Sequence, residues 1–339
     1  MLNKIIGTFL FILVFNIYPE GKTIYMVPPP GYGEEFFDPK HIMHSDDLNK
    51  PFRVLKQKVE ELGYKLRLTD LKKPMDDFFA IIVLHPPSKD LLDTLKDYPL
   101  EKRMWVILEP PVTWSVYYDP SYHSYFGKIF ITVDDYVDNS KYFKLYFPQP
   151  ILQMAEVVPF AEKKLCTLIS SHKSSCHHYE LYSERRRAAT FFEKTAPDEF
   201  DLYGYDWKKK DFPSYKGKLD SKHNTMRNYA FCICYENMHH INGYVSEKIF
   251  DAFKAGCVPV YWGATNITDF IPASCFIDKR NFESYETLYE FIKGMKEDTY
   301  NDYLRNIRSF FDSEQARLFS TEYFVDMLIR HLDIKDKSA

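Results

Sequence analysis

Short apolar segments alternate with amphipathic segments through the first half of the chain. Residues 79–84 and 104–108 are almost uninterrupted apolar runs, which is typical of strands buried on both faces of a parallel sheet. Residues 52–62 carry Val and Leu side chains at helical spacing and are followed by a glycine, as expected for an amphipathic helix. The order of these patterns, β-α-β-β-α-β, predicts a mostly parallel sheet.

The second half shows the same alternation most clearly in one strand–helix–strand segment. Residues 229–235 form an apolar run with strand composition, and residues 257–262 form a second buried strand. Ser246 is a suitable N-cap for the amphipathic helix between them, and Gly256 stands where a helix-terminating glycine belongs. This pattern predicts a βαβ unit, in which a ligand binds beyond the carboxyl ends of the strands.

Length and composition point to a two-domain globular protein. The 339 residues suit two domains, and Pro148-Gln149-Pro150 marks the predicted boundary between residues 22–150 and residues 151–339, which include the terminal helices. The predicted fold class is α/β, with two doubly wound, Rossmann-like domains facing a cleft. The aromatic content of 17% suits either a carbohydrate-binding surface or a bulky core, and a formal charge of −4 gives no sign of a nucleic-acid partner.

The extreme N-terminus carries a largely apolar run at residues 5–18. This run is shorter than the ~20 residues that a membrane-spanning helix needs. Together with Lys4 it is typical of a signal peptide or short membrane anchor within residues 1–21. Membrane association or the secretory pathway is then expected; if the segment is instead a first buried strand and helix, the protein is cytoplasmic.

Two clusters of potential metal ligands are better explained without a metal. Cys176-His177-His178 has no second ligand pair at zinc-like spacing. Asp134-Asp135 lacks an intervening residue between its carboxylates and suits a turn. His239-His240 lies in a predicted loop, where contact with an acceptor is an alternative. No metal site is predicted.

Polar residues gather at the predicted ligand edge of the βαβ unit. Glu236 and Asn237 end its first strand, and Tyr244, Glu247 and Lys248 stand at or near the start of its helix. Free backbone N–H groups and a lysine favour a phosphate there, and a nearby carboxylate suits a ribose diol. The alternative is that Glu247 only complements the helix dipole and that Lys248 is a solvated side chain.

The amino-acid sequence of this segment resembles the donor-binding signature of the α1,3/α1,4-fucosyltransferase family. The matching motifs are Tyr235-Glu236-Asn237, Tyr244-Val245-Ser246-Glu247-Lys248 and Val258-Pro259-Val260 followed by Gly263. The resemblance implies an inverting enzyme of the GT-B fold, with GDP-fucose bound by the second domain and an acceptor glycan by the first. It also implies donor-binding roles for Asn237, Tyr244, Glu247 and Lys248.

Glu109 is the candidate base. It directly follows the strand at 104–108 and precedes Pro110-Pro111, so its carboxylate is expected at the ligand edge of the first sheet. The resemblance implies that an acidic residue in this context deprotonates the acceptor hydroxyl. The alternative is a surface carboxylate that caps a turn.

A basic triplet supplies the candidate diphosphate ligand. Residues 180–194 are predicted to be helical and contain Arg185-Arg186-Arg187. Counted back from Asp201-Leu202-Tyr203-Gly204, the family's diphosphate-binding arginine falls on Arg187; a shifted register would place it at Arg185. The hydroxyl-rich loop at residues 170–175 can cradle a diphosphate or serve as an ordinary connection.

The chemistry that the resemblance implies is a single displacement. GDP is a good leaving group, so the expected needs are cations for the diphosphate and one base, Glu109. Glu236 is expected to stabilise the oxocarbenium-like transition state, and no cofactor is required, with a divalent metal at most accessory. The expected acceptor is an N-acetyllactosamine-type chain fucosylated α1,3 on GlcNAc. The alternatives are a GT-B transferase for another nucleotide sugar and a catalytically silent glycan-binding protein.

Overall fold

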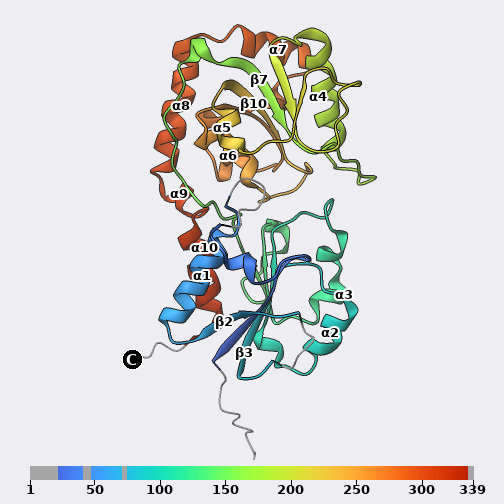
Figure 1. The fold of residues 1–339 in the computed structure, drawn as a ribbon, viewed down its shortest axis with the longest axis vertical. Helices are drawn as coiled ribbons and strands as arrows, with labels where there is room; N and C mark the ends of the chain where they lie inside the picture. Colours follow the sequence, from blue (N-terminus) through green and yellow to red (C-terminus); the bar gives the residue numbers. More distant parts are fainter. Residues whose placement is uncertain (1–21, 41–46, 71–74, 335–339) are drawn as a thin grey trace, which may run out of the picture.

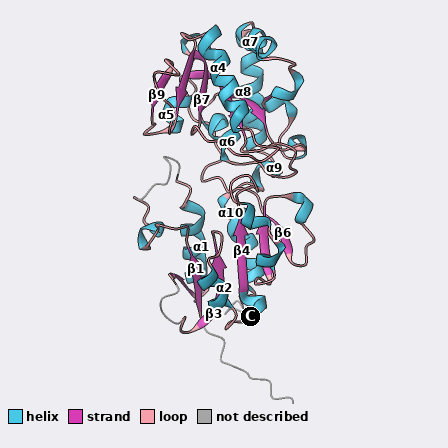
Figure 2. Ribbon diagram, turned by 90° about the vertical axis from the view of Figure 1, so that its right-hand side faces the viewer, coloured by secondary structure: helices cyan, strands magenta, loops and turns pink. Residues whose placement is uncertain are grey.

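The computed structural model describes residues 22–40, 47–70 and 75–334, which form two lobes (Figure 1). Each lobe contains one six-stranded sheet, and every strand pair within each sheet is parallel. The strands of the two sheets lie in separate lobes, with mostly loops between them (Figure 2). The predicted α/β class with two doubly wound domains is confirmed. The predicted leader at residues 1–21 lies outside the described residues, and no helix within them is long and apolar enough to cross a membrane.

The first sheet has the strand order β2-β1-β3-β4-β5-β6. Its strands are β1 (Thr23–Val27), β2 (Lys65–Leu68), β3 (Phe78–Val83), β4 (Arg103–Ile107), β5 (Lys128–Ile131) and β6 (Tyr142–Lys144). Alternate side chains of β1 enter different cores: Ile24 and Met26 contribute to one, whereas Tyr25 and Val27 contribute to the other. This period of two is what a strand covered by helices on both faces requires.

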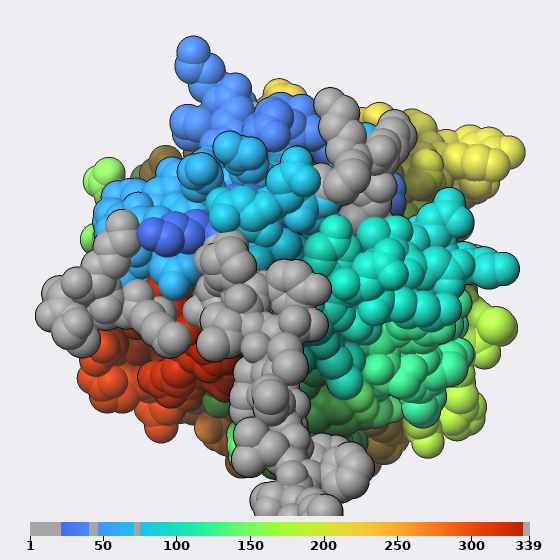
Figure 3. Space-filling view, turned by 90° about the horizontal axis from the view of Figure 1, so that it is seen from below, coloured from blue at the N-terminus to red at the C-terminus, as the bar shows by residue number. Residues whose placement is uncertain are grey.

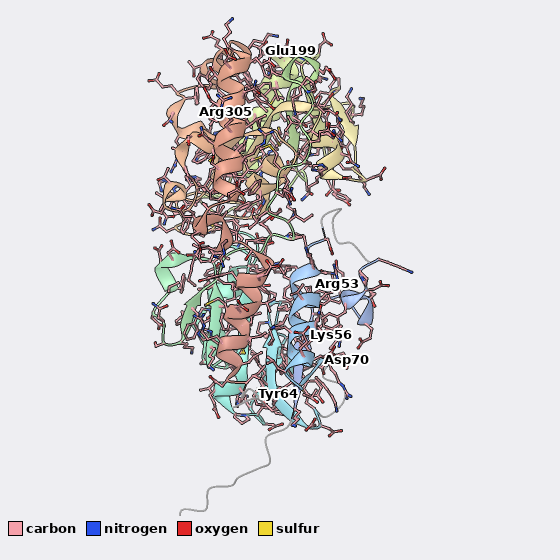
Figure 4. All side chains as sticks on the ribbon, turned by 90° about the vertical axis from the view of Figure 1, so that its left-hand side faces the viewer. Arg53, Lys56, Tyr64, Asp70, Glu199 and Arg305 are labelled. Atoms are coloured by element: carbon pink, nitrogen blue, oxygen red, sulfur yellow. The ribbon has the colours of Figure 1, made fainter. Side chains whose placement is uncertain are left out.

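The helices of the first lobe divide between these two faces. They are α1 (Lys50–Glu61), α2 (Lys89–Leu95) and the short α3 (Pro120–His123). Phe52, Leu55 and Val59 of α1 enter the core on one face, whereas Leu91 and Leu95 of α2 enter the core on the other. Arg53 and Lys56 lie on α1 outside this apolar stripe (Figure 4). The predicted order β-α-β-β-α-β is the observed order β1-α1-β2-β3-α2-β4.

The second sheet has the order β12-β11-β10-β7-β8-β9. Its strands are β7 (Lys164–Ile169), β8 (Phe200–Tyr203), β9 (Tyr215–Gly217), β10 (Tyr229–Tyr235), β11 (Val258–Trp262) and β12 (Ile277–Asp278). The helices that follow β6 are α4 (Tyr182–Thr195), α5 (Lys222–Met226), α6 (Glu247–Lys254), α7 (Tyr285–Lys293), α8 (Glu297–Phe311), α9 (Glu314–Arg317) and α10 (Thr321–Leu332). The strand order reverses between β7 and β10, which creates a crevice at their carboxyl ends.

The predicted βαβ unit is β10-α6-β11. Ser246 is the N-cap of α6, and its side chain accepts a hydrogen bond from the backbone N–H of Lys248. Gly256 follows the helix with a φ of +62°, a left-handed conformation that favours glycine. Both end signals were therefore correctly predicted from the sequence.

The last helix, α10, returns to the first lobe. Phe324, Val325 and Leu328 belong to the core that α1 also enters, and the Phe324 ring lies 5.4 Å from the Phe52 ring. In Figure 3 the red C-terminal segment lies against the blue segment that contains α1. The prediction that assigned all terminal helices to the second domain is therefore wrong for α10. An amphipathic helix must bury its apolar stripe, and this stripe finds its partner on the first sheet.

Two segments of the chain connect the lobes, and these segments contact each other. Gln149, within the predicted boundary, forms a parallel bridge with Ser320. Its backbone N donates to Phe319 O at 2.7 Å, and its own O accepts from Thr321 Oγ1 at 3.1 Å. The two crossings thus run side by side and are joined by hydrogen bonds.

Candidate active site

A cavity opens at the crevice between β7 and β10 of the second sheet. Its wall combines the ends of these strands with parts of α4, α5 and α6, and Glu109 reaches it from the first lobe. The cavity opens to solvent at the edge where ligands of open α/β sheets bind. Of the predicted site residues, Glu109, Asn237, Glu247 and Lys248 line it.

The buried carboxylate of Glu236 organises the end of β10. Its side chain has no solvent exposure, and its Oε1 accepts a hydrogen bond from the backbone N of Ser246 at 2.8 Å. Its Oε2 accepts from Ser246 Oγ at 2.6 Å and lies 3.3 Å from Lys248 Nζ. At Gly263, a Cβ would lie 2.4 Å from Glu236 Cγ, so only glycine leaves room for this carboxylate. Glu236 therefore fixes the first turn of α6 and does not line the cavity.

Lys248 and Glu247 present opposite charges at this helix start. Lys248 Nζ lies 3.0 Å from Ser246 Oγ and 3.6 Å from Glu247 Oε1. Burial acts to lower the pKa of Lys248, but the carboxylates of Glu247 and Glu236 outweigh it and raise this pKa. Burial acts to raise the pKa of Glu247, but Lys248 and Lys222 outweigh it and lower this pKa to about 2. At neutral pH the cavity therefore contains a charged ammonium beside a charged carboxylate.

Arg185 provides the second cation of the cavity wall. It is 4% exposed, and its guanidinium donates to Tyr235 O at 2.7 Å and to Asn237 Oδ1 at 3.0 Å. Arg187 instead has a side chain that is 70% exposed, pairs with Glu184 and does not line the cavity. Two residues correspond to about 200° around a helix, so Arg185 and Arg187 point in nearly opposite directions. The assignment to Arg187 is therefore corrected: the shifted register with Arg185 fits the cavity.

Asn237 connects the two lobes at Glu109. Its Nδ2 donates to Thr113 Oγ1 at 3.2 Å and lies 3.4 Å from Glu109 Oε2. Burial raises the pKa of Glu109, and the charge of Glu247 adds to this rise, although Lys248, Thr113 and Lys173 oppose it. The carboxylate that faces the cavity from the first lobe therefore retains its proton to a higher pH than an ordinary glutamate does.

Tyr244 belongs to the same sequence motif as Glu247 and Lys248, but it packs in a core and does not face the cavity. It is 1% exposed, does not line the cavity and belongs to a core of the first lobe. The loop before it is held to that lobe by a hydrogen bond from Lys144 Nζ to Gly243 O at 3.0 Å and by one from Asn242 Nδ2 to Asp135 Oδ1 at 3.0 Å. Tyr244 thus anchors the second lobe to the first.

Asp251, Lys222 and Gly204 are among the cavity residues that the sequence analysis missed. Asp251 is 3% exposed and lies one turn after Glu247 on α6, and Lys222 Nζ contacts its Oδ2 at 3.1 Å. Gly204 has a φ of +128°, and a Cβ there would lie 2.0 Å from Ser170 O. The spacing of Glu247 and Asp251 could have revealed the aspartate, because side chains four residues apart share a helix face. The contact of Gly204 with Ser170 depends on the packing of two loops and has no local signal.

The candidate metal ligands do not form a metal site in the part of the chain that the structure describes. No group of three or more His, Cys, Asp or Glu side chains there is arranged to hold an ion. Asp134 pairs with Lys144, whose Nζ lies 2.6 Å from its Oδ1. That the activity requires no metal or cofactor remains a prediction.

The second half of the chain matches a known protein family and is similar in sequence to known proteins. Residues 161–327 match the family described as "Glycosyltransferase family 10 (fucosyltransferase) C-term". An α-(1,4)-fucosyltransferase of Arabidopsis thaliana is 37% identical over 86 residues, which are 25% of this chain and 21% of that protein. The α-(1,3)-fucosyltransferase FucT of Helicobacter pylori is 35% identical over 76 residues, which are 22% of this chain and 16% of that protein. The matches thus span about a fifth of the length of these relatives.

Solved structures share the fold over nearly the whole chain. An α1,3-fucosyltransferase crystallised with GDP has a TM-score of 0.58 at 13% identity, over 94% of this chain and 92% of that one. The DNA-modifying enzyme β-glucosyltransferase has a TM-score of 0.52 at 13% identity, over 92% of this chain and 99% of that one. At such low identity these structures show the two-lobed fold alone.

Proposed function

We propose that this chain, whose residues 161–327 match glycosyltransferase family 10 (fucosyltransferase), transfers L-fucose from GDP-fucose to a hydroxyl of an acceptor glycan. One observation carries the proposal. A carboxylate with a raised pKa, Glu109, faces a cavity whose wall holds Lys248 and the buried Arg185. A proton acceptor across a cavity from two cations is the arrangement that displacement of a nucleoside diphosphate requires.

The second lobe binds the donor in this proposal. Lys248, Arg185 and the N-terminus of α6 neutralise the charge that develops on the diphosphate as it leaves. Glu247, ionised beside Lys248, accepts hydrogen bonds from the ribose hydroxyls. Glu236 acts as a positioning residue, because Ser246 and Lys248 already occupy its carboxylate oxygens. This role replaces the transition-state stabilisation expected from the sequence.

The reaction is a single displacement with inversion. The acceptor oxygen forms a bond to the anomeric carbon as the bond from that carbon to the diphosphate oxygen breaks. Glu109 takes the hydroxyl proton, and Asn237 holds this carboxylate through its Nδ2 contact. No step requires a cofactor. The expected product carries fucose α1,3-linked to GlcNAc of an N-acetyllactosamine-type chain, and the N-terminal segment is proposed to associate with a membrane or enter the secretory pathway.

The proposal is tested by donor competition. The full chain is incubated with an N-acetyllactosamine acceptor and labelled GDP-fucose, UDP-galactose or GDP-mannose, and the product linkage is determined by NMR. GDP-fucose is expected to be the preferred donor and to give an α-linked product from a β-linked donor. Equal turnover of UDP-galactose would favour a transferase for another sugar. Saccharide binding without any turnover would show a silent glycan-binding protein.

A further inference from the structure

Two loops that are distant in sequence form a short antiparallel pair beside the cavity. The backbone N of Leu181 donates to Asn237 O at 3.0 Å, and the backbone N of His239 donates to Tyr179 O at 2.9 Å. Between these hydrogen bonds, Glu180 and Met238 form an isolated bridge. The pair therefore begins at Asn237, in the cavity wall, and extends away from it.

The side chains of this pair gather into a cluster of rings. The Tyr179 ring lies 4.8 Å from His178, 5.5 Å from His239 and 5.0 Å from His240. His239 also lies 5.4 Å from the Trp262 ring at the end of β11. We call Tyr179, His178, His239 and His240 the ring cluster. Its members come from two loops, so the fold and not the local sequence brings them together.

The ring cluster is exposed at its outer surface. Tyr179 is 38% exposed, and His178 and His240 are also exposed. His240 has a φ of +51°, a left-handed conformation that costs energy in a residue other than glycine. Burial lowers the pKa of His239, so its ring is neutral at neutral pH. A core-packing role would bury these rings, whereas a binding surface leaves them accessible.

The first lobe places another exposed ring at the same junction. Trp114 is 54% exposed and directly follows Thr113, whose Oγ1 accepts the hydrogen bond from Asn237 Nδ2. The same Nδ2 lies 3.4 Å from the Glu109 carboxylate. The ring cluster and Trp114 therefore belong to different lobes. His239 and His240 follow Asn237 within three residues, Trp114 directly follows Thr113, and neither the ring cluster nor Trp114 lines the donor cavity.

We propose that the ring cluster and Trp114 bind the acceptor saccharide and present its hydroxyl to Glu109. Broad, rigid rings with polar edges suit the apolar faces and hydroxyl rims of a pyranose, because such rings provide contact area at little entropic cost. The position outside the donor cavity, beside the proposed base, is where a second substrate must enter. This inference rests on the proposed function, since it assumes that an acceptor glycan is the second substrate.

The test measures the two substrates separately. Tyr179→Ala and Trp114→Ala are each expected to raise the KM for an N-acetyllactosamine acceptor about tenfold or more, which corresponds to about 1.4 kcal/mol or more. The Kd for GDP, measured by calorimetry, should remain within about twofold of the original, because phosphate-binding residues are unchanged. Tyr179→Phe and Trp114→Phe keep a ring and should retain most acceptor affinity. Phe291→Ala, which removes a 42% exposed ring on α7, is the matched control.

The outcomes separate this inference from the proposed function. Normal acceptor KM in both alanine variants would overturn the ring-cluster assignment while leaving fucosyl transfer intact. Equal losses of acceptor affinity and GDP binding would also overturn it, since they indicate a general disturbance of the site. If the unaltered protein neither binds GDP nor turns over GDP-fucose, the proposed function itself fails.

Discussion

The two lobes have sheets of the same kind but differ in what stands at the ends of their strands. In the second lobe, the ends of β7 and β10 adjoin the buried charges of Glu236 and Arg185 and the partly buried charge of Lys248. In the first lobe, the end of β4 contributes one carboxylate, Glu109, to the cavity. Parallel strands thus bring side chains to one edge of each sheet, and the side chains at that edge decide the chemistry.

The electrostatic settings of these carboxylates differ as well. Glu247 lies beside Lys248, and its pKa is lowered to about 2. Glu109 contacts the side-chain amide of Asn237, and burial raises the pKa of Glu109. A carboxylate kept ionised is suited to accept hydrogen bonds from a ligand, whereas one with a raised pKa is better matched to take up a proton. This division of roles, and the packing that joins α10 to the first lobe, can be tested by substitution and by varying the pH.

Glu109→Gln should have the largest effect. The amide keeps the shape of the side chain but cannot accept the acceptor proton, so kcat should fall by a factor on the order of 10² to 10⁴. The Kd for GDP should change little. Glu101→Gln removes an exposed carboxylate at the opposite end of β4 and serves as the control. Full activity in Glu109→Gln would remove the proposed base.

Arg185→Ala and Arg187→Ala should differ strongly. Loss of the buried Arg185 should lower kcat/KM by a factor on the order of 10² to 10³, as for other groups that stabilise developing negative charge. Arg187 forms an exposed ion pair with Glu184, so its loss should change kcat/KM by less than about twofold. Arg185→Lys keeps the charge but not the fork of donors, and should recover only part of the loss. A larger effect at Arg187 than at Arg185 would show that Arg187 is the diphosphate-binding residue, as first predicted from the sequence.

Phe324→Ala should weaken the first lobe although the residue lies near the end of the chain. Phe324 is 1% exposed and packs against Phe52, so its truncation should lower the free energy of unfolding by about 3–5 kcal/mol. Thermal and denaturant unfolding measure this loss. Met327→Ala changes a partly buried neighbour on the same helix and should cost less. Equal costs would show that α10 does not depend on this contact.

The pH dependence should report the raised pKa of Glu109. Because the base acts when ionised, kcat/KM should fall as pH decreases through this pKa, by about tenfold per pH unit below it. The same shift has the opposite sign for stability: the folded state holds this proton more tightly, so its contribution to stability is present at low pH and lost as pH rises through the folded pKa. Glu109→Gln should remove that contribution. An acid limb at the pKa of an ordinary glutamate would contradict the assignment.

Local patterns in the sequence predicted most of the fold. The βαβ unit from β10 to β11 was recognisable because its apolar runs, Ser246 cap and Gly256 end all agree. Glu109 was found because a residue that directly follows a buried strand must lie at the ligand edge of the sheet.

Features set by long-range packing could not be predicted in this way. The choice between Arg185 and Arg187 depends on which side of α4 meets the sheet. Because three arginines are adjacent in the sequence, the sequence does not show which of them faces the cavity. The apolar stripe of α10 predicts burial but not the lobe that buries it. The ring cluster joins histidines that have no fixed spacing in sequence, so only the fold reveals it.

The hydrogen-bonded crossings at Gln149 and Ser320 have a consequence for motion. Two separate connections would restrain the lobes at two points, whereas these two are joined by a parallel bridge and act as one pivot. Pro148 and Pro150 stiffen one side of that pivot by fixing φ on either side of Gln149. A rotation of one lobe about this pivot would have to stretch the contacts of Asn237 with Glu109 and Thr113, so the pivot and these contacts together set how wide the cavity mouth can open.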